Sequence, residues 1–164
     1  VCLILNKITL ICVGKLKERF FTDACNEYLK RLGRFCSAEV KEITESRVSD
    51  NANESEISAA MAQEADKILS LLPEKAYVVA MCVEGEKLSS EKFAKGIAKT
   101  ALSGYNHTAF IIGGSNGLDK ELKKRADLRL SMSDMTFPHH LARVMLLEQI
   151  YRAFQINNNG KYHK

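Results

Sequence analysis

An apolar run that ends in glycines is the feature of this sequence most suggestive of a ligand site. The run Phe110–Ile112 leads directly into Gly113 and Gly114, and Gly117 follows three residues later. Glycine removes a side chain where a ligand or another stretch of backbone must come close, and a tight turn is the simpler alternative. The spacing matches neither a G-x-G-x-x-G motif nor a P-loop, because no Lys-Ser or Lys-Thr pair follows. The usual dinucleotide and triphosphate sites are therefore disfavoured.

Soft apolar side chains flank these glycines in the sequence and at the ends of neighbouring predicted strands. Such groups suit an adenine ring or a thioether, and from composition alone they suit a hydrophobic core equally well. They are Met81, Leu118, Met132, Met135 and Phe137. The sequence leaves both interpretations open.

Histidine and cysteine give little support for metal or covalent chemistry. Among four histidines, His139 and His140 are adjacent and so point in different directions, and no carboxylate stands at ligand spacing. We therefore expect no metal site. The five cysteines form no C-x-x-C pair and none has an adjacent histidine, which disfavours nucleophilic catalysis and fits a reducing cytosol.

Charged and aromatic groups follow toward the carboxyl terminus. Arg143 and Glu148 lie five residues apart in a predicted helix, where two solvated charges are the simplest interpretation. The chain ends in KYHK, Lys161–Lys164. A frayed terminus is the default expectation. A tyrosine, however, can stack on a base, a lysine can meet a phosphate and a histidine can move a proton.

Strands that alternate with helices must position these groups. Hydrophobic patterning predicts strands over 7–14, 38–43, 76–83, 108–112 and 128–133. It predicts helices over 20–32, 54–72, about 90–103, 119–126 and 140–154. This alternation predicts one α/β domain with a mostly parallel sheet, whose ligands lie beyond the carboxyl ends of the strands. The polar, unpatterned segment 44–55 is expected to be a mobile loop.

The composition is that of an ordinary soluble globular protein. The 164 residues are 46% hydrophobic and 27% charged, with a net charge of +4. A mildly basic chain permits an RNA partner without requiring one. No apolar run reaches the roughly 18 residues that span a membrane, and the opening VCLIL is too short for a signal peptide. We expect a cytoplasmic protein in which residues 1–6 have no assigned role.

Three segments together resemble a known family. KITLICVGK, FIIGGSNGL and TFPHHLARVMLLEQIYRAFQI with its terminal Tyr-His are similar to the small SPOUT-class methyltransferases. These enzymes methylate N3 of a pseudouridine in bacterial 23S ribosomal RNA. The likeness runs from about Lys7 to Lys164 and implies a single SPOUT domain over 7–164 with a C-terminal trefoil knot. It also implies S-adenosylmethionine as cofactor and a homodimer that acts on the large subunit of the assembled ribosome.

The resemblance further assigns residues to the cofactor. They lie at the end of the third strand, in the glycine pair and in the loop after the fifth strand. The positions are Met81, Gly113, Met132, Ser133, Asp134, Met135, Thr136 and Phe137. Family members often have leucine at the Met81 position, a replacement that conserves volume.

The chemistry needs a group that removes the N3 proton, and the sequence does not rank the candidates His163, Glu148 and His140. Arg143 is expected to position a phosphate or polarise a uracil carbonyl. The residues expected to contact RNA are Lys161, Tyr162 and Lys164. Two rival functions are a non-catalytic RNA- or ribosome-binding module with the same fold and an unrelated nucleotide-binding α/β enzyme. The intact tail and glycine loop argue against the first, and the absent phosphate motifs argue against the second.

Overall fold

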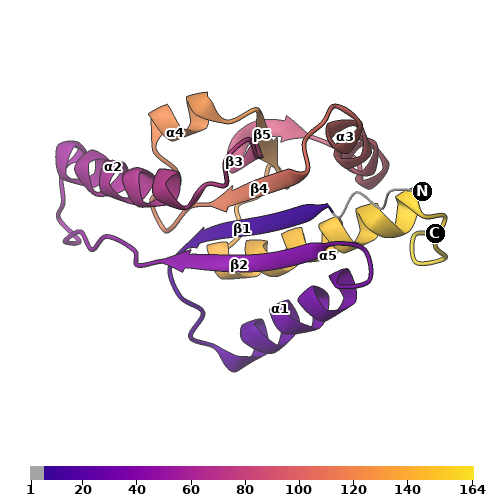
Figure 1. The fold of residues 1–164 in the computed structure, drawn as a ribbon. Helices are drawn as coiled ribbons and strands as arrows, with labels where there is room; N and C mark the ends of the chain where they lie inside the picture. The colour runs from indigo at the N-terminus through magenta and orange to yellow at the C-terminus, as the bar shows by residue number, and fades with distance from the viewer. Residues whose placement is uncertain (1–5) are drawn as a thin grey trace.

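Five parallel strands form the centre of the structure, a computed structural model that describes residues 6–164 (Figure 1). They are β1 (Lys7–Val13), β2 (Ser37–Ile43), β3 (Tyr77–Lys87), β4 (His107–Ile112) and β5 (Leu128–Ser131). Their order across the sheet is β2-β1-β4-β3-β5, and every pairing is parallel. The predicted α/β fold with a parallel sheet is confirmed.

Helices cover both faces of this sheet. They are α1 (Arg19–Leu32), α2 (Glu54–Leu71), α3 (Ser90–Leu102), α4 (Lys120–Arg125) and α5 (His139–Asn157). One core lies between the sheet and α1, α3 and α5, and the other lies between the sheet and α2 and α4. In Figure 1, α1 lies below the sheet and α5 passes behind β1 and β2, while α2 and α4 lie toward the top. Strand side chains alternate accordingly, with Leu10 and Phe110 in the first core and Ile11 and Ile111 in the second.

Local sequence signals explain where most of the helices begin. Asn53 and Glu56 form a reciprocal capping box at the start of α2, and the side chains of Ser89 and Asp119 cap α3 and α4. Helix α5 has no side-chain cap and starts directly after Pro138. A proline fixes its own φ and disfavours helix in the residue before it, so the helix can begin only there.

Strand β3 is longer than predicted. It continues to Lys87, and its pairing with β5 shifts register between Met81 and Glu86. A Cβ on Gly85 would lie 2.7 Å from the backbone carbon of Leu130, so glycine is required where the two strands approach. The chain beyond the predicted strand 76–83 is therefore an irregular continuation of β3 that pairs with β5.

The connections open a crevice at the carboxyl edge of the sheet. The chain turns after β3 toward α3 on one face, whereas after β4 it turns toward α4 on the other. Ligands of open parallel sheets bind where neighbouring connections diverge in this way. The segment 132–138 crosses this edge from β5 to the end of β1. The crossing is shown by His139, whose Nε2 lies 3.4 Å from the position that a Cβ on Gly14 would occupy.

The start of the chain was expected to lie outside the fold up to residue 6. Residues 1–5 fall outside the described part of the structure. Asn6, in contrast, extends the sheet, because its carbonyl accepts a 3.0 Å hydrogen bond from the backbone N–H of Ser37. No helix within residues 6–164 is long and apolar enough to cross a membrane.

Candidate functional site

A cavity of about 860 Å³ lies beyond the carboxyl ends of β3 and β4, beside β5. Its walls come from the end of β3, from the glycine loop 112–118, from the end of β5, from the crossing segment 132–138 and from the first turn of α5. The structure brings together there nearly all residues predicted to bind a cofactor: Met81, Gly113, Met132, Ser133, Met135, Thr136 and Phe137. The volume is within the range of small-molecule sites, roughly 300–1,000 Å³. Asp134 is the exception, because its side chain is 83% exposed and pairs with Lys87 at 2.6 Å.

The glycine loop is held tight by its own backbone. The carbonyl of Gly114 accepts a 3.0 Å hydrogen bond from the N–H of Gly117, and Gly117 has a φ of +81°. A Cβ on Gly113 would lie only 2.5 Å from the carbonyl oxygen of Gly117. Of the two causes that the sequence left open, backbone approach therefore explains Gly113, and ligand approach is not needed to account for it.

Glu45 fastens the glycine loop from outside and is a site residue that the sequence analysis missed. Its Oε1 accepts a 2.8 Å hydrogen bond from Ser115 N–H and lies 2.5 Å from the position of a Cβ on Gly114. The hydrogen bond from the Ser115 N–H is the main cause that lowers the pKa of the Glu45 carboxyl, and burial opposes it.

The polar segment 44–55, predicted to be mobile, is thus anchored where it begins. Glu45 accepts the hydrogen bond from Ser115 described above. In addition, the backbone N–H of Ser46 donates a 2.7 Å hydrogen bond to Glu64, which is buried on α2. A lone glutamate in a polar stretch carries no pattern that distinguishes it from a solvated charge. No sequence signal identified Glu45 as a site residue.

His139 lines the larger cavity, whereas its neighbour His140 does not. Burial, the neighbouring His140 and the more distant Arg143 lower the pKa of His139, while Glu45 opposes the shift. His140 turns to the other side, with its Nδ1 3.6 Å from the carboxylate of Glu18 and its ring edge-on to Phe21.

Arg143 is a buried cation, not one of two solvated charges. Only 1% of the residue is exposed, and Nη2 donates a 2.9 Å hydrogen bond to the carbonyl of Gly14. Its Nη1 lies 3.4 Å from a carboxylate oxygen of Glu42, and its Nε has no hydrogen-bond partner within residues 6–164. Arg143 stands one helical turn after His139, so it fastens the first turn of α5 to the end of β1. In this structure it holds a backbone carbonyl and does not line the larger cavity.

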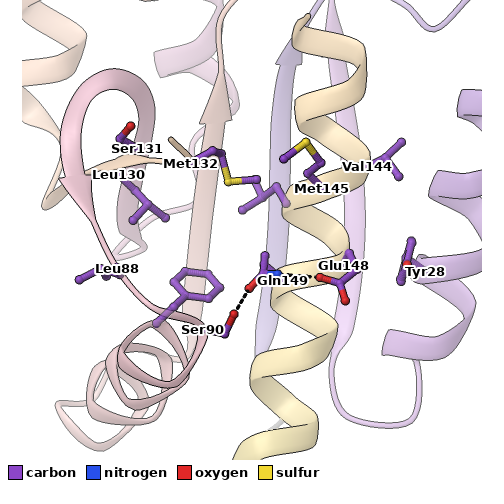
Figure 2. Close-up of a pocket in the computed structure, with 12 residues that line it drawn as sticks. Tyr28, Leu88, Ser90, Leu130, Ser131, Met132, Val144, Met145, Glu148 and Gln149 are labelled. Carbon is purple, nitrogen blue, oxygen red and sulfur yellow. Dashed lines mark hydrogen bonds between the residues drawn. The ribbon is translucent and has the colours of Figure 1, made fainter. Parts of the chain in front are cut away.

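A second cavity, of about 540 Å³, adjoins the first and shares Leu130, Ser131 and Met132 with it. Figure 2 shows Met132 and Met145 on opposite sides of this second cavity, with Glu148 and Gln149 on the α5 side. The Gln149 side chain accepts a 2.7 Å hydrogen bond from the Ser90 hydroxyl and donates a 2.8 Å bond to Glu148. Glu148 therefore belongs to a polar network at the second cavity and not to the glycine-lined one.

The tail folds back on α5 instead of fraying. The Tyr162 hydroxyl donates a 3.1 Å hydrogen bond to Glu148, and its ring packs 4.9 Å from that of Tyr151. The Arg152 guanidinium lies 4.8 Å from the centre of the Tyr162 ring and also bonds Glu148. Burial and the Glu148 hydrogen bond raise the pKa of Tyr162 to about 12, so its hydroxyl remains a donor.

His163 lies between the first turn of α3 and Arg152 on α5. Its Nε2 lies 2.9 Å from Glu91 and its Nδ1 lies 3.2 Å from Arg152. The Glu91 backbone N–H, His163 and Ser89 lower the pKa of Glu91 to about 2, so it stays ionised beside the imidazole. Lys161 and Lys164 are exposed. The residues predicted to remove a proton are therefore dispersed: Glu148 and His163 lie near the second cavity or the tail, and His140 faces Glu18.

A family model described as predicted SPOUT methyltransferase matches residues 6–163. The chain belongs to the SPOUT methyltransferase family. As a member of this family it is an enzyme, and the rival interpretation as a non-catalytic module is not supported. Within residues 6–164, no three His, Cys, Asp or Glu side chains are grouped so as to hold a metal ion.

Curated relatives match this methyltransferase over almost its whole length. A protein of Streptococcus thermophilus named ribosomal RNA large subunit methyltransferase H is 48% identical over 158 residues, 96% of this chain and 99% of the relative. Proteins of the same name from Streptococcus equi subsp. zooepidemicus and Bifidobacterium animalis subsp. lactis are 45% and 47% identical, with the same coverage.

Solved structures share the fold at low sequence identity. The tRNA (m1G37) methyltransferase from Aquifex aeolicus has a TM-score of 0.55 and 16% identity, covering 90% of this chain and 70% of that one. A probable methylase family protein from Haemophilus influenzae has a TM-score of 0.53 and 14% identity, covering 98% and 71%. At these identities the likeness concerns the fold alone.

Proposed function

We propose that this SPOUT methyltransferase transfers the methyl group of S-adenosylmethionine to N3 of a pseudouridine in bacterial 23S ribosomal RNA. In this proposal it acts as a homodimer on the large subunit of the assembled ribosome. The observation that carries the proposal is the 45–48% identity, over 96% of the chain, to proteins named ribosomal RNA large subunit methyltransferase H.

The residues of the larger cavity fit S-adenosylmethionine. Met81, Met132 and Phe137 offer soft apolar walls for an adenine ring and a thioether, and Lys120 adds a cation suited to a carboxylate. When bound, the cofactor supplies a methyl group that its positively charged sulfur already activates. The protein therefore has to orient the attacking nitrogen and take up its proton, and it needs no covalent intermediate.

The crossing segment 132–138 has two roles in this scheme. It forms one wall of the larger cavity, and it connects β5 to the start of α5 across the sheet edge. A chain that crosses there and then continues as α5 is what the proposed trefoil knot requires. The crossing supports the knot, which remains part of the proposal.

A second protomer is also part of the proposal. Tyr162 and His163 pack on their own chain near the second cavity, away from the glycine loop that lines the larger one. Contact between the tail and a nucleotide at the larger cavity therefore calls for another copy of the chain. Helix α5 offers an interface, because its predicted apolar positions Leu141, Val144 and Tyr151 are only half-buried in the single chain.

The proposal is tested with ribosomes from cells that lack the gene. Purified protein is incubated with these ribosomes and methyl-deuterated S-adenosylmethionine, and the digested 23S RNA is analysed by mass spectrometry. We expect a deuterated methyl group on N3 of one pseudouridine. A matched control uses ribosomes that carry uridine at that position, and these should remain unmodified.

The same samples separate the parts of the proposal. Transfer to naked 23S RNA as fast as to ribosomes would reject the ribosomal substrate while leaving the chemistry intact. Transfer of label to another base, or none to ribosomal RNA, would reject the proposed reaction. Sedimentation of the purified protein tests the dimer independently, and a monomer at working concentration would reject it.

A further inference from the structure

We propose that His139 accepts the proton of the nitrogen that becomes methylated, and that Glu45 acts beside it as a positioning residue. This inference rests on the proposed function, because it assigns a role within that reaction. It names none of the three candidates that the sequence left unranked, His163, Glu148 and His140. Both residues were unassigned by the sequence, His139 being considered only as a metal ligand and Glu45 not at all.

The first step of the argument is placement at the cavity. A proton acceptor must reach the nitrogen that attacks the methyl group, so it must lie at the cavity that fits the cofactor. His139 is the one histidine among residues 6–164 that lines the larger cavity. Within the same chain, His140 contacts Glu18 and His163 contacts Glu91, and neither lines the larger cavity of its own protomer.

The second step is the convergence of polar groups at the end of β1. A single point, the position of a Cβ on Gly14, lies 3.4 Å from His139 Nε2, 3.7 Å from His140 Nε2 and 3.9 Å from Glu45 Oε2. Gly14 has a φ of +88°, and the absence of a side chain there leaves room for these groups. Two imidazoles and one carboxylate thus come close to one point at the end of β1, and of these three side chains His139 lines the larger cavity.

The third step concerns the charge that His139 would carry. A neutral imidazole accepts a proton, and burial together with His140 and Arg143 favours the neutral form by lowering the pKa of His139. Glu45 is the one acidic group that opposes this shift, so it stabilises the imidazolium once the proton has arrived. Glu18 acts on the pair through its contact with His140.

Glu45 also connects the proton acceptor to the wall of the cavity. One carboxylate oxygen accepts a hydrogen bond from the N–H of Ser115 in the glycine loop, while the other lies 3.9 Å from the Gly14 Cβ position that His139 Nε2 approaches to 3.4 Å. The backbone next to Glu45 is held in turn by the hydrogen bond that Ser46 N–H donates to Glu64. Movement of the loop would therefore move the carboxylate, which makes Glu45 a positioning residue that acts through His139.

The step balances in atoms and charge. The substrate nitrogen forms a bond to the methyl carbon as the carbon–sulfur bond breaks, and the electron pair of that bond stays on sulfur. The proton on the nitrogen passes to the unprotonated ring nitrogen of His139, which becomes an imidazolium beside Glu45. The imidazolium then releases the proton to water, and the residue is ready for another cycle.

The test compares His139→Gln with the wild-type protein in single-turnover methyl transfer to ribosomes between pH 6 and 9. General-base catalysis contributes about 10²–10⁴-fold, so we expect the rate at pH 7 to fall by at least about 100-fold. The rate should climb with pH in the variant, because hydroxide replaces the missing base. Calorimetry should show affinity for S-adenosylmethionine within about threefold of wild type.

Two further variants sharpen the comparison. His107→Gln is the matched control: His107 is also a half-buried histidine with a pKa lowered by burial, but it stands at the amino-terminal end of β4, bonded to Thr9. Its rate and pH profile should match wild type. Glu45→Gln keeps an oxygen for Ser115 but removes the charge, so the rate should fall while the pH profile shifts.

Several outcomes would overturn the inference. A wild-type pH profile in His139→Gln would do so, and so would a fall in cofactor affinity as large as the fall in rate. Loss of activity in His140→Gln with none in His139→Gln would assign the role to the neighbour. If wild-type protein transfers no methyl group to ribosomes, the proposed function fails instead.

A readout that does not depend on turnover tests His139 directly. The pKa of its imidazole can be followed by ¹⁵N NMR in the protein with bound S-adenosylmethionine, since the chain has only four histidines. We expect a neutral ring at pH 7 and a lower pKa in Glu45→Gln, because the carboxylate that raises it is gone. A ring already charged at pH 7 would overturn the inference whatever the substrate.

Discussion

Replacement of Gly113 by alanine should damage the glycine loop through its own backbone. The added Cβ would lie 2.5 Å from the carbonyl oxygen and 2.6 Å from the carbonyl carbon of Gly117. Ordinary contacts begin at 3.4 Å, so the two strands of the loop must separate by about 0.9 Å. This movement would stretch the hydrogen bond between Gly114 and Gly117, because both obstructing atoms are backbone and cannot rotate away.

The cost follows from the size of this misfit. Overpacking that forces backbone shifts costs about 1–3 kcal/mol. For a chain of this length each kcal/mol lowers Tm by about 2–4 °C, so we expect a fall of roughly 2–12 °C. Because the displaced loop lines the larger cavity, affinity for S-adenosylmethionine should fall by about tenfold or more, equivalent to about 1.4 kcal/mol.

Differential scanning calorimetry measures the change in Tm, and titration calorimetry measures the affinity. Gly96→Ala is the matched control, because Gly96 lies in α3 with nothing within 4 Å of its added Cβ. Alanine is about 0.8–1.0 kcal/mol better than glycine inside a helix, so this variant should gain stability and bind normally. If Gly113→Ala keeps both the wild-type Tm and the wild-type affinity, the loop is not held as tightly as the distances indicate, and the reasoning fails.

Three more predictions address the surroundings of the cavity. Arg143→Met should lower the free energy of unfolding by about 1–3 kcal/mol in urea denaturation, because the buried carbonyl of Gly14 loses its donor; unchanged stability would contradict this. The pKa of Glu45 is lowered in the folded state, so its ionised form stabilises the fold above about pH 4.5 and that contribution is lost as the pH falls. The stability difference between wild type and Glu45→Gln should therefore shrink from pH 6 to pH 3, and a difference that grows would reverse the sign. Deletion of residues 161–164 should cost about 1 kcal/mol, since it removes the packing of Tyr162, and should abolish methyl transfer to ribosomes; full activity would exclude a role of the tail.

The sequence predicts the elements of the fold because their causes are local. Hydrophobic alternation, the capping residue Asn53 and the helix stop at Pro73 each act within a few residues, so the boundaries agree closely with the structure. The predicted carboxyl-terminal end of β3, residue 83, is too early. The continuation of the strand to Lys87 depends on pairing with β5 across the register shift, which is not a local effect. The position of the cavity also follows from the sequence, since parallel strands bring their carboxyl ends to one edge.

The roles of individual residues at that edge depend on the tertiary structure. The sequence leaves open why glycine stands at position 113, and only the folded loop reveals that the close neighbour is the backbone of Gly117. Arg143 has the same sequence context as a solvated helix charge. Its burial depends on the return of α5 beneath β1, where the carbonyl of Gly14 offers an acceptor.

The adjacent histidines separate most clearly the features that have local causes from those that depend on long-range contacts. Helical geometry requires the Cα–Cβ bonds of His139 and His140 to leave the helix about 100° apart, which the sequence alone determines, although their rings lie 4.2 Å apart. Which of them faces the cavity depends on the rotation of α5 about its axis. That rotation is determined by the crossing of segment 132–138 and by the anchoring of Arg143 at the end of β1, contacts between residues more than a hundred positions apart. Glu45 joins the site for the same reason, since only the parallel pairing of β2 with β1 brings it within reach of the glycine loop.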